Sequence, residues 1–332
     1  MKKILKGILY LIIAVILLVV IGLSYITLAL PNVGDPENIK VEATPARIAR
    51  GAYLANHVML CTDCHSKRDW NIYGGPEITG TTGGGGELFD HRVAFPGSVH
   101  VPNITPYKLK DWTDGELFRA ITTGERKNGH AIFPLMPWPY YSRMNREDIY
   151  SVIVYIRTLQ PITADYPESQ LDFPLNIIVH TMPQKASLGE IPSQSDTLKY
   201  GAYVINAAGC VECHTQVDKG AIIHGMEFAG GRPFAMSGNV VRSANITTDK
   251  STGIGNWTEA AFVARFKAYG DISKVAKLAK GENQTIMPWY DYAGMTETDL
   301  RAIYTYLRTV KPISNKVEKF QVNSAPAVSG SN

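Results

Sequence analysis

The sequence has no surplus of positive charge beyond its first residues, and no long stretch in which apolar and polar residues alternate. Of 332 residues, 33 are Lys or Arg and 30 are Asp or Glu, and Lys2, Lys3 and Lys6 are the only charges before residue 31. The rest of the chain therefore balances at 30 against 30 (33 − 3 = 30), which argues against nucleic-acid binding. Without β alternation, we expect a mainly α fold with long loops.

Long apolar runs are also scarce, and the one present lies at the N-terminus. Residues 8–30 contain no charge and no proline, and they are long enough to span a bilayer as a helix. A cleaved signal peptide is the alternative, but residues 27–31 (TLALP) match a small-residue cleavage site poorly. We predict a retained anchor over residues 1–30. The lysines before it place a periplasmic body on a single-pass protein of the bacterial cytoplasmic membrane.

An internal repeat appears when the two Cys-x-x-Cys-His segments are aligned. The matching pairs are RGAYLANHVMLCTDCH (50–65) with YGAYVINAAGCVECH (200–214), NIT (103–105) with NIT (245–247), WT (112–113) with WT (257–258), MPWPYYSRM (136–144) with MPWYDYAGM (287–295), and DIYSVIVYIRTLQPI (148–162) with DLRAIYTYLRTVKPI (299–313). Length differences fall between these landmarks, where loops tolerate them. We predict two tandem domains over residues 45–163 and 197–314.

Each copy is expected to be a small helical bundle. Thr44 and Pro45 start a first helix that runs toward Cys61, and Thr113 to Glu116 form a capping box for a middle helix. Closing helices begin at the caps Asn145 and Thr296 and end before Pro161 and Pro312. Their apolar positions recur at helical spacing and predict one buried stripe each, made of Ile149, Val152, Ile153 and Ile156 in the first copy and Leu300, Ile303, Tyr304 and Leu307 in the second.

The remaining segments are interpreted as connections. Residues 31–44 and 164–196 are linkers, but the apolar middle of the second (173–179) is expected to pack between the domains. Residues 315–332 are a polar tail, expected to be poorly ordered. The glycine-rich residues 79–89 lack the Lys-Ser or Lys-Thr of a phosphate-binding loop and are interpreted as a flexible loop.

Cysteine is scarce, and all four cysteines lie in CTDCH (61–65) and CVECH (210–214). Two disulfides, or one zinc ion held by four thiolates, would leave His65 and His214 unexplained. Covalent haem uses every residue of the motif. On a helical turn, thiols at i and i+3 share a face and can each join a haem vinyl group, and the histidine at i+4 reaches the iron. We predict two covalently bound haem c groups, one on Cys61, Cys64 and His65 and one on Cys210, Cys213 and His214.

A second iron ligand is expected on the opposite face of each haem. Met136 and Met287 are the candidates, because each precedes a proline that stiffens its loop and because thioether ligands are typical of electron carriers. The other methionines are interpreted as core residues (Met59, Met182, Met226, Met236) or helix staples (Met144, Met295). The unpaired histidines are expected on the surface or in loops (His57, His91, His100, His130, His180, His224), although His130 is an alternative ligand to Met136. The repeated Trp112, Trp257, Asn103 and Asn245 are either haem-propionate donors or ordinary structural residues.

Together these motifs, with STGIGNWTEAAF (251–262), resemble class I cytochromes c in tandem, and in particular the multihaem cytochrome subunits of membrane-bound alcohol and sugar dehydrogenases. The resemblance implies haem on Cys61, Cys64, Cys210 and Cys213, with His65, Met136, His214 and Met287 on iron. It implies electron transfer from a dehydrogenase to quinone, a terminal oxidase or another cytochrome. The chain departs from the acetic-acid-bacterial subunits in having two haem motifs where they have three, and in its N-terminal anchor.

Three functions are compatible with two such motifs. An electron carrier needs both irons closed by two protein ligands, and the matching MPW segments favour this function. A dihaem enzyme such as a peroxidase is the alternative, and it would need one Met replaced so that one iron is open. A haem-based sensor ranks last, because no signalling domain accompanies the motifs. We therefore predict an electron-transfer protein and not an enzyme.

Overall fold

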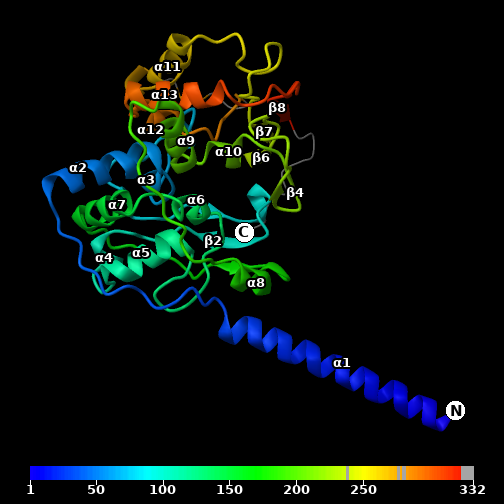
Figure 1. Cartoon of the computed structure of the whole chain (residues 1–332). Coiled ribbons are helices and arrows are strands. Elements are labelled where there is room, and N and C mark those ends of the chain that lie inside the picture. Colours follow the sequence, from blue (N-terminus) through cyan, green and yellow to red (C-terminus); the bar gives the residue numbers. More distant parts are fainter. Residues whose placement is uncertain (237–238, 275–276, 279–281, 323–332) are drawn as a thin grey trace. The chain divides into compact units, whose positions relative to one another are not determined.

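The computed structural model describes residues 1–236, 239–274, 277–278 and 282–322 (Figure 1). Helices are the main regular structure of these residues, which form two compact units. The first unit contains Met1–Lys40, Trp112–Arg143 and Gln170–Ser187, and the second contains Val41–Asp111, Met144–Ser169 and the described residues from Leu188 onward. The predicted domain boundaries at 45–163 and 197–314 differ from this division, and they stay a prediction.

The first unit begins with the long apolar helix α1 (Lys2–Ala29), which has no buried residue (Figure 1). It is the one helix among the described residues that is long and apolar enough to cross a membrane, a test that a signal sequence also passes. The unit also contains α5 (Asp114–Thr123), α6 (Trp138–Tyr141), β3 (Gln170–Leu171), α8 (Leu175–Ile178) and a 3₁₀ turn (Val179–Thr181).

The connection that follows α1 is fixed to α5. Arg119 and Glu125 form a buried ion pair at 2.9 Å, and both also bind this connection. The Arg119 guanidinium donates to the carbonyl oxygen of Gly34 (3.1 Å), and the Glu125 carboxylate accepts from the backbone N–H of Val33 (3.2 Å). The first part of the predicted 31–44 linker is therefore held by a buried charge pair.

The apolar part of the 164–196 linker does not have the predicted burial. Its middle forms the short helix α8, yet Phe173 is 78% exposed and Ile178 is 43% exposed. The expectation that residues 173–179 are packed between domains is therefore wrong for these side chains. Of this stretch, Val179 is buried.

The second unit contains two pairs of crossed helices. α2 (Pro45–Tyr53) packs on α7 (Arg146–Thr158), and α9 (Thr197–Ala207) packs on α13 (Glu297–Leu307) (Figure 1). A glycine lies at each crossing. A Cβ atom at Gly51 would lie 1.9 Å from the Ser151 carbonyl oxygen, and one at Gly201 would lie 2.1 Å from that of Ala302. The GAY motif of each copy thus allows the first and closing helices to approach closely.

Shorter elements complete the second unit. The helices are α3 (Cys61–Cys64), α4 (Pro106–Leu109), α10 (Cys210–Cys213), α11 (Glu259–Lys267) and α12 (Trp289–Ala293), with a π turn (Leu54–Val58) and 3₁₀ turns (His91–Val93, Ile272–Lys274). The strands are β1 (Leu88–Phe89), β2 (Gly97–His100), β4 (Val217–Asp218), β5 (Ala221–Ile222), β6 (Pro233–Met236), β7 (Asn239–Arg242) and β8 (Phe320–Val322). β1 pairs with β2, β4 with β5, β6 with β7 and β7 with β8, all antiparallel.

Strand β8 belongs to the predicted polar tail. Its pairing with β7 contradicts the expectation of poor order for Phe320–Val322. The rest of the tail, residues 323–332, lies outside the described residues. Residues 320–322 of the tail thus form an edge strand of a small sheet.

The predicted helix caps and stripes are confirmed. Thr44, Asn145 and Thr296 cap their helices through their side chains, and Thr113 with Glu116 forms the reciprocal capping box. Both stripes are buried except for the half-buried Tyr304. The closing helices end at Thr158 and Leu307, a few residues before the prolines that were expected to stop them.

Candidate haem sites

Each Cys-x-x-Cys-His segment is a single helical turn that starts from a left-handed residue. Leu60 (φ 58°) precedes α3 and Gly209 (φ 62°) precedes α10. The backbone N–H of the motif histidine then bonds to the carbonyl of the first cysteine, at 2.9 Å for His65 and 3.0 Å for His214. This geometry places both thiols and the imidazole on one face of the turn. A left-handed non-glycine residue costs about 1–2 kcal/mol, so the conformation at Leu60 is held by its surroundings.

The motif histidines share one hydrogen bond that the sequence did not predict. The Nδ1 atom of His65 lies 2.7 Å from the carbonyl oxygen of Pro102, and that of His214 lies 2.8 Å from the carbonyl oxygen of Ala244. A carbonyl oxygen can only accept, so Nδ1 carries the proton and donates in each case. The lone pair of each ring is therefore on Nε2, the nitrogen that would ligate iron. Orientation by a backbone carbonyl is typical of metal-ligating histidine.

Burial lowers the pKa of the His214 imidazole and outweighs the opposing effect of the Ala244 carbonyl. The neutral ring is the form that binds a metal. The chemistry of this side chain thus fits an iron ligand.

The glycine-rich loop donates a hydrogen bond to the backbone of the first motif histidine, so its interpretation as a flexible loop is wrong. The N–H of Gly85 donates to the His65 carbonyl (2.8 Å), and Gly85 itself is buried with φ 72°. A Cβ atom there would lie 2.6 Å from the carbonyl carbon of Pro102, the residue that orients the imidazole. In the second copy, Gly230 makes the matching bond to His214 at 2.7 Å.

A residue with a hydroxyl group follows each motif and accepts a hydrogen bond from the same loop. Ser66 and Thr215 are fully buried, and each accepts a backbone N–H at 3.1 Å, from Gly83 and Phe228 respectively. Their position after the motif in both copies was an available sequence signal. In each copy, the hydroxyl residue and the paired glycine thus hold the backbone next to the motif histidine in place.

The repeated asparagines are structural residues. Asn103 accepts from the N–H and hydroxyl of Thr105, and its amide donates to the carbonyl of Ile162 (2.7 Å). Asn245 makes the same bonds to Thr247 and donates to the carbonyl of Ile313 (2.8 Å). Each side chain therefore joins the segment that orients a histidine to the chain that follows a closing helix. The paired tryptophans are less buried, since Trp112 is half-buried and Trp257 is 38% exposed.

The two candidate methionines occupy the same local turn. The N–H of Trp138 donates to the Met136 carbonyl (2.7 Å), and the N–H of Trp289 donates to the Met287 carbonyl (2.8 Å). The prolines between them have φ −78° and ψ 44° in the first copy, and φ −79° and ψ 69° in the second. Both are close to an inverse γ-turn centred on the proline.

Of these methionines, Met287 belongs to the second unit together with His214, and Met136 belongs to the first unit. The pairing of Met136 with His65 stays a prediction. The Met144 and Met295 side chains are fully buried, as helix staples require. Met59 is also buried.

The four cysteines form neither a disulfide nor a metal cluster among the described residues. All four cysteines are free thiols. Among the described residues, no group of three or more His, Cys, Asp or Glu side chains could hold a metal ion. Burial raises the pKa of the Cys61 and Cys210 thiols to about 12, so both are protonated near neutral pH.

One unpaired histidine differs from its predicted surface position. His57 is half-buried in the π turn, and its Nδ1 lies 2.9 Å from the carbonyl oxygen of Asp291 in the other copy. Burial lowers the pKa of its imidazole. His130 is exposed, as predicted.

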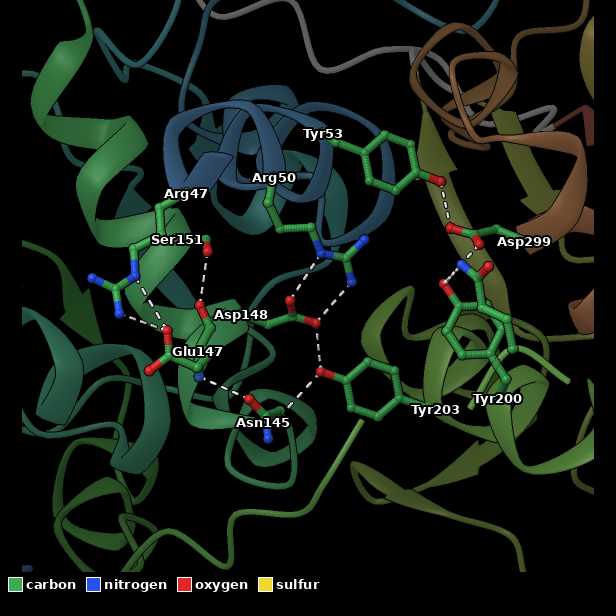
Figure 2. A network of polar contacts seen from close by, with 11 residues as sticks. Arg47, Arg50, Tyr53, Asn145, Glu147, Asp148, Ser151, Tyr200, Tyr203 and Asp299 are labelled. Carbon is green, nitrogen blue, oxygen red and sulfur yellow. Dashed lines mark hydrogen bonds and ion pairs between the residues drawn. The ribbon is translucent and has the colours of Figure 1, made fainter. Parts of the chain in front are cut away.

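The two copies meet in a reciprocal network of tyrosines and carboxylates (Figure 2). Tyr203 of the second copy donates to Asp148 of the first (2.6 Å), and Tyr53 of the first donates to Asp299 of the second. Each carboxylate also accepts hydrogen bonds within its own copy, Asp148 from Nε and Nη2 of Arg50 at 2.9 Å each and Asp299 from the Tyr200 hydroxyl at 2.8 Å. Both aspartates are 2% exposed.

The tyrosine hydroxyls also accept backbone bonds from the caps of the closing helices. The N–H of Asn145 donates to Tyr203 (3.2 Å), and the N–H of Thr296 donates to Tyr53 (3.0 Å). Each of these tyrosine contacts thus has a counterpart in the other copy. The network fixes α2, α7, α9 and α13 relative to one another.

A second contact joins the loop after the first motif to the Met287 loop. Gln284 is buried and accepts from the N–H of Gly74 (2.7 Å), and its amide donates to the carbonyl of Ile72 (2.8 Å). Tyr290 donates to the carbonyl of Tyr73 (2.8 Å). The chain following Cys61–His65 therefore packs directly against the chain that carries a candidate ligand of the second site.

Comparison with known proteins identifies one part of the chain. A model of the family "Cytochrome c" matches residues 198–311. The cytochrome c subunit of quinone alcohol dehydrogenase from Gluconacetobacter polyoxogenes is 26% identical over 288 residues, which cover 82% of this chain and 58% of that protein. The fructose dehydrogenase cytochrome subunit from Gluconobacter japonicus is 28% identical over 301 residues (81% and 54%). This chain therefore spans little more than half the length of these two relatives.

A third relative has nearly the same length. The diheme cytochrome c-type protein from Cereibacter sphaeroides is 24% identical over 312 residues, which cover 90% of this chain and 96% of that protein. Its match extends over both Cys-x-x-Cys-His segments by length. The relatives are thus named as cytochromes or as the cytochrome subunits of dehydrogenases.

Proposed function

Starting from a chain whose residues 198–311 form a cytochrome c domain, we propose that the protein is a dihaem c-type cytochrome with two tandem domains. It carries electrons between a dehydrogenase and the respiratory chain, and it is an electron-transfer component and not itself a catalytic enzyme. Haem supplies the one-electron chemistry, and the protein supplies attachment, ligands and a closed environment.

The observation that carries this proposal is the orientation of the two motif histidines. In both copies an Nδ1–H bond to a backbone carbonyl leaves Nε2 as the coordinating nitrogen, next to two thiols on the same helical face. A disulfide does not require a histidine oriented in this way, whereas the iron of a haem attached by thioethers needs one as a ligand. The dihaem relative of nearly equal length supports two groups in one chain.

Eight residues would hold the two groups. They are Cys61, Cys64, His65 and Met136 for the first haem, and Cys210, Cys213, His214 and Met287 for the second. The inverse γ-turns at both methionines support a pair of closed, six-coordinate irons, because the same stiff loop is present twice. This symmetry disfavours the peroxidase alternative, in which one iron must open to peroxide.

Transfer between the two sites is supported by the contacts between the copies. The tyrosine–aspartate network and the Gln284 contact hold the first motif and the Met287 loop in one rigid unit. A fixed separation lets an electron pass between two sites without a conformational step. The two haems would then act as one relay.

Partners and location follow from the relatives and from α1. A dehydrogenase is the proposed donor, and quinone, a terminal oxidase or another cytochrome is the proposed acceptor. Helix α1 is proposed as a retained anchor in the bacterial cytoplasmic membrane, with the body in the periplasm. The greater length of the dehydrogenase subunits leaves the identity of the donor to experiment.

Mass spectrometry and ligand variants test the proposal together. The intact mass of the mature protein should show two added haems and no free thiol. Met136→Ala and Met287→Ala should each keep both haems attached, because the thioethers remain, but should open one iron per chain to carbon monoxide. Met226→Ala is the matched control, since Met226 is half-buried and has no counterpart in the other copy.

Three results would contradict the proposal. A mass without haem rejects the cofactor, and low-spin spectra that stay unchanged in both methionine variants reject the ligand assignment. Rapid turnover of peroxide by the unmodified protein would favour the dihaem enzyme.

A further inference from the structure

The linker helix α8 and the two residues before it expose an apolar surface without a partner in the first unit. This surface, here called the α8 patch, consists of residues 173–178. Phe173 is 78% exposed and Ile178 is 43% exposed, while Leu175 and Ile177 are half-buried. An aromatic side chain so fully exposed beside an exposed isoleucine is a common mark of an interaction surface.

The α8 patch is held next to the C-terminal end of α1. The Nδ1 atom of His180 lies 3.0 Å from the carbonyl oxygen of Leu30, and this oxygen can only accept, so the imidazole donates. Leu30 is the C-cap of α1, where the carbonyls have no partner within the helix. Helix α8 and the 3₁₀ turn Val179–Thr181 also pack against α1, as Figure 1 shows for α8.

The end of α1 is where a spanning helix would leave the hydrocarbon. Because the buried ion pair of Arg119 and Glu125 also fixes the chain immediately after α1, the α8 patch has a defined place relative to the helix. An apolar segment at this depth meets the boundary between lipid headgroups and acyl chains. Amphipathic segments bind at this boundary through their apolar side chains.

The charge around the α8 patch agrees with an apolar contact. Between Thr158 and Gln184 the sequence has no Lys or Arg, and Asp165, Glu168 and Asp172 are the only charged side chains. Attraction to anionic lipid would need basic residues. On neutral lipid the contact is therefore expected to be insensitive to salt, whereas anionic lipid should weaken it by repelling these carboxylates.

We propose that residues 173–178 insert into the membrane interface beside α1 and form a second, apolar membrane contact. The inference rests on the proposed function only in taking α1 as a membrane anchor. One helix alone leaves a body free to tilt and turn, whereas a helix and an adjacent inserted segment restrict its orientation. The α8 patch would thereby restrict the orientation of the first unit at the membrane surface.

Site-directed spin labelling of the full chain tests this proposal. In the holoprotein the native cysteines are consumed by thioethers, so Ile178→Cys introduces the one thiol available for a nitroxide. The labelled protein is placed in nanodiscs of neutral phosphatidylcholine, without any partner protein. Collisions of the label are measured with oxygen, which concentrates in the bilayer, and with a water-soluble nickel chelate. Leu198→Cys is the matched control, since Leu198 is an apolar residue of the second unit that is 44% exposed.

The label at position 178 should collide more often with oxygen than with nickel, and the ratio should not change at high salt. The label at position 198 should favour nickel. In the chain labelled at position 178, the further substitution Phe173→Ser should lower the oxygen preference. This second variant separates insertion of the α8 patch from mere proximity of the label to lipid.

Each outcome decides the matter, and the intact mass of the labelled chain separates the two proposals. If α1 is retained and the label at 178 favours nickel, the α8 patch is not inserted and this inference is wrong, while the anchor stands. If the mass shows that α1 has been removed, the anchor proposal fails. The same measurement with added vesicles then tests the α8 patch alone, and a nickel preference there also overturns the inference.

Discussion

Tyr53→Phe and Tyr203→Phe each remove one hydroxyl from the tyrosine–aspartate network, and we expect the two variants to lose unequal amounts of stability. Asp299 is buried and receives the hydroxyls of Tyr53 and Tyr200, and no Lys or Arg forms an ion pair with it among the described residues. Asp148 is equally buried, but it accepts a bidentate pair of hydrogen bonds from Arg50 in addition to the bond from Tyr203. The two carboxylates thus differ in what remains after one tyrosine is lost.

The magnitudes follow from the bonds that remain. A hydrogen bond to a charged group contributes about 1.5–3 kcal/mol, and a buried charge that loses its partners costs more than an average bond. Tyr53→Phe leaves Asp299 with one side-chain donor and no cation, so we expect a loss of about 2–3 kcal/mol in the free energy of unfolding. Tyr203→Phe leaves the bond to Arg50 intact, and we expect a loss of about 1–1.5 kcal/mol.

Guanidinium unfolding of the holoprotein, followed by far-ultraviolet circular dichroism, gives both values. Tyr107→Phe is the control, because Tyr107 donates to the exposed carboxylate of Asp165 and its loss should change little. Equal losses for the two buried tyrosines, or a larger loss for Tyr203→Phe, would refute the reasoning. So would a loss at Tyr107 comparable to that at Tyr53.

Three further outcomes are expected. Burial raises the pKa of the Tyr53 hydroxyl, with the nearby carboxylate acting in the same direction, so the folded state favours the protonated form. Stability from this group is present below about pH 10 and lost above it, and alkaline titration of unfolding should be less steep in Tyr53→Phe. Gly230→Ala should weaken low-spin haem absorbance, because its Cβ would lie 2.4 Å from the Ala244 carbonyl carbon, whereas Gly129→Ala, with the same sign of φ and nothing within 4 Å, should not. Gly201→Ala, whose Cβ would meet a carbonyl oxygen of α13 at 2.1 Å, should lower the melting temperature sharply, and an unchanged value would exclude the close helix crossing.

Local rules predicted the elements that local chemistry determines. Thr44, Thr113, Asn145 and Thr296 act as caps because their side chains satisfy N–H groups only two or three residues away. The buried stripes followed equally from helical spacing. Such features need no knowledge of the rest of the chain.

The errors arose where an apolar or flexible sequence has more than one possible environment. Hydrophobicity indicates that residues 173–179 avoid water, but it does not say whether protein or lipid covers them. The lack of Lys-Ser or Lys-Thr after the glycines of residues 79–89 excludes a phosphate-binding loop, but it does not indicate how these glycines pack. Aligning Gly85 with Gly230, each of which bonds to a motif histidine, would have indicated a structural role for both.

The contacts between the copies could not have been predicted from spacing, since Tyr53 and Asp299 are 246 residues apart. The available signal was that a tyrosine in the first helix and an aspartate in the closing helix recur in both copies.

That recurrence has a physical consequence. When residue i of one copy binds residue j of the other, and j of the first binds i of the second, the contact has the reciprocal pattern of an isologous interface between two identical chains. Tyr53 with Asp299, and Tyr203 with Asp148, have this pattern inside one chain. The two bonds thus lie at matching positions of the two copies. Arg50 and Tyr200 stand at matching places beside the two carboxylates, and there the halves differ, since one carboxylate has a cation and the other a hydroxyl. The unequal losses expected for the two tyrosine variants measure this difference directly.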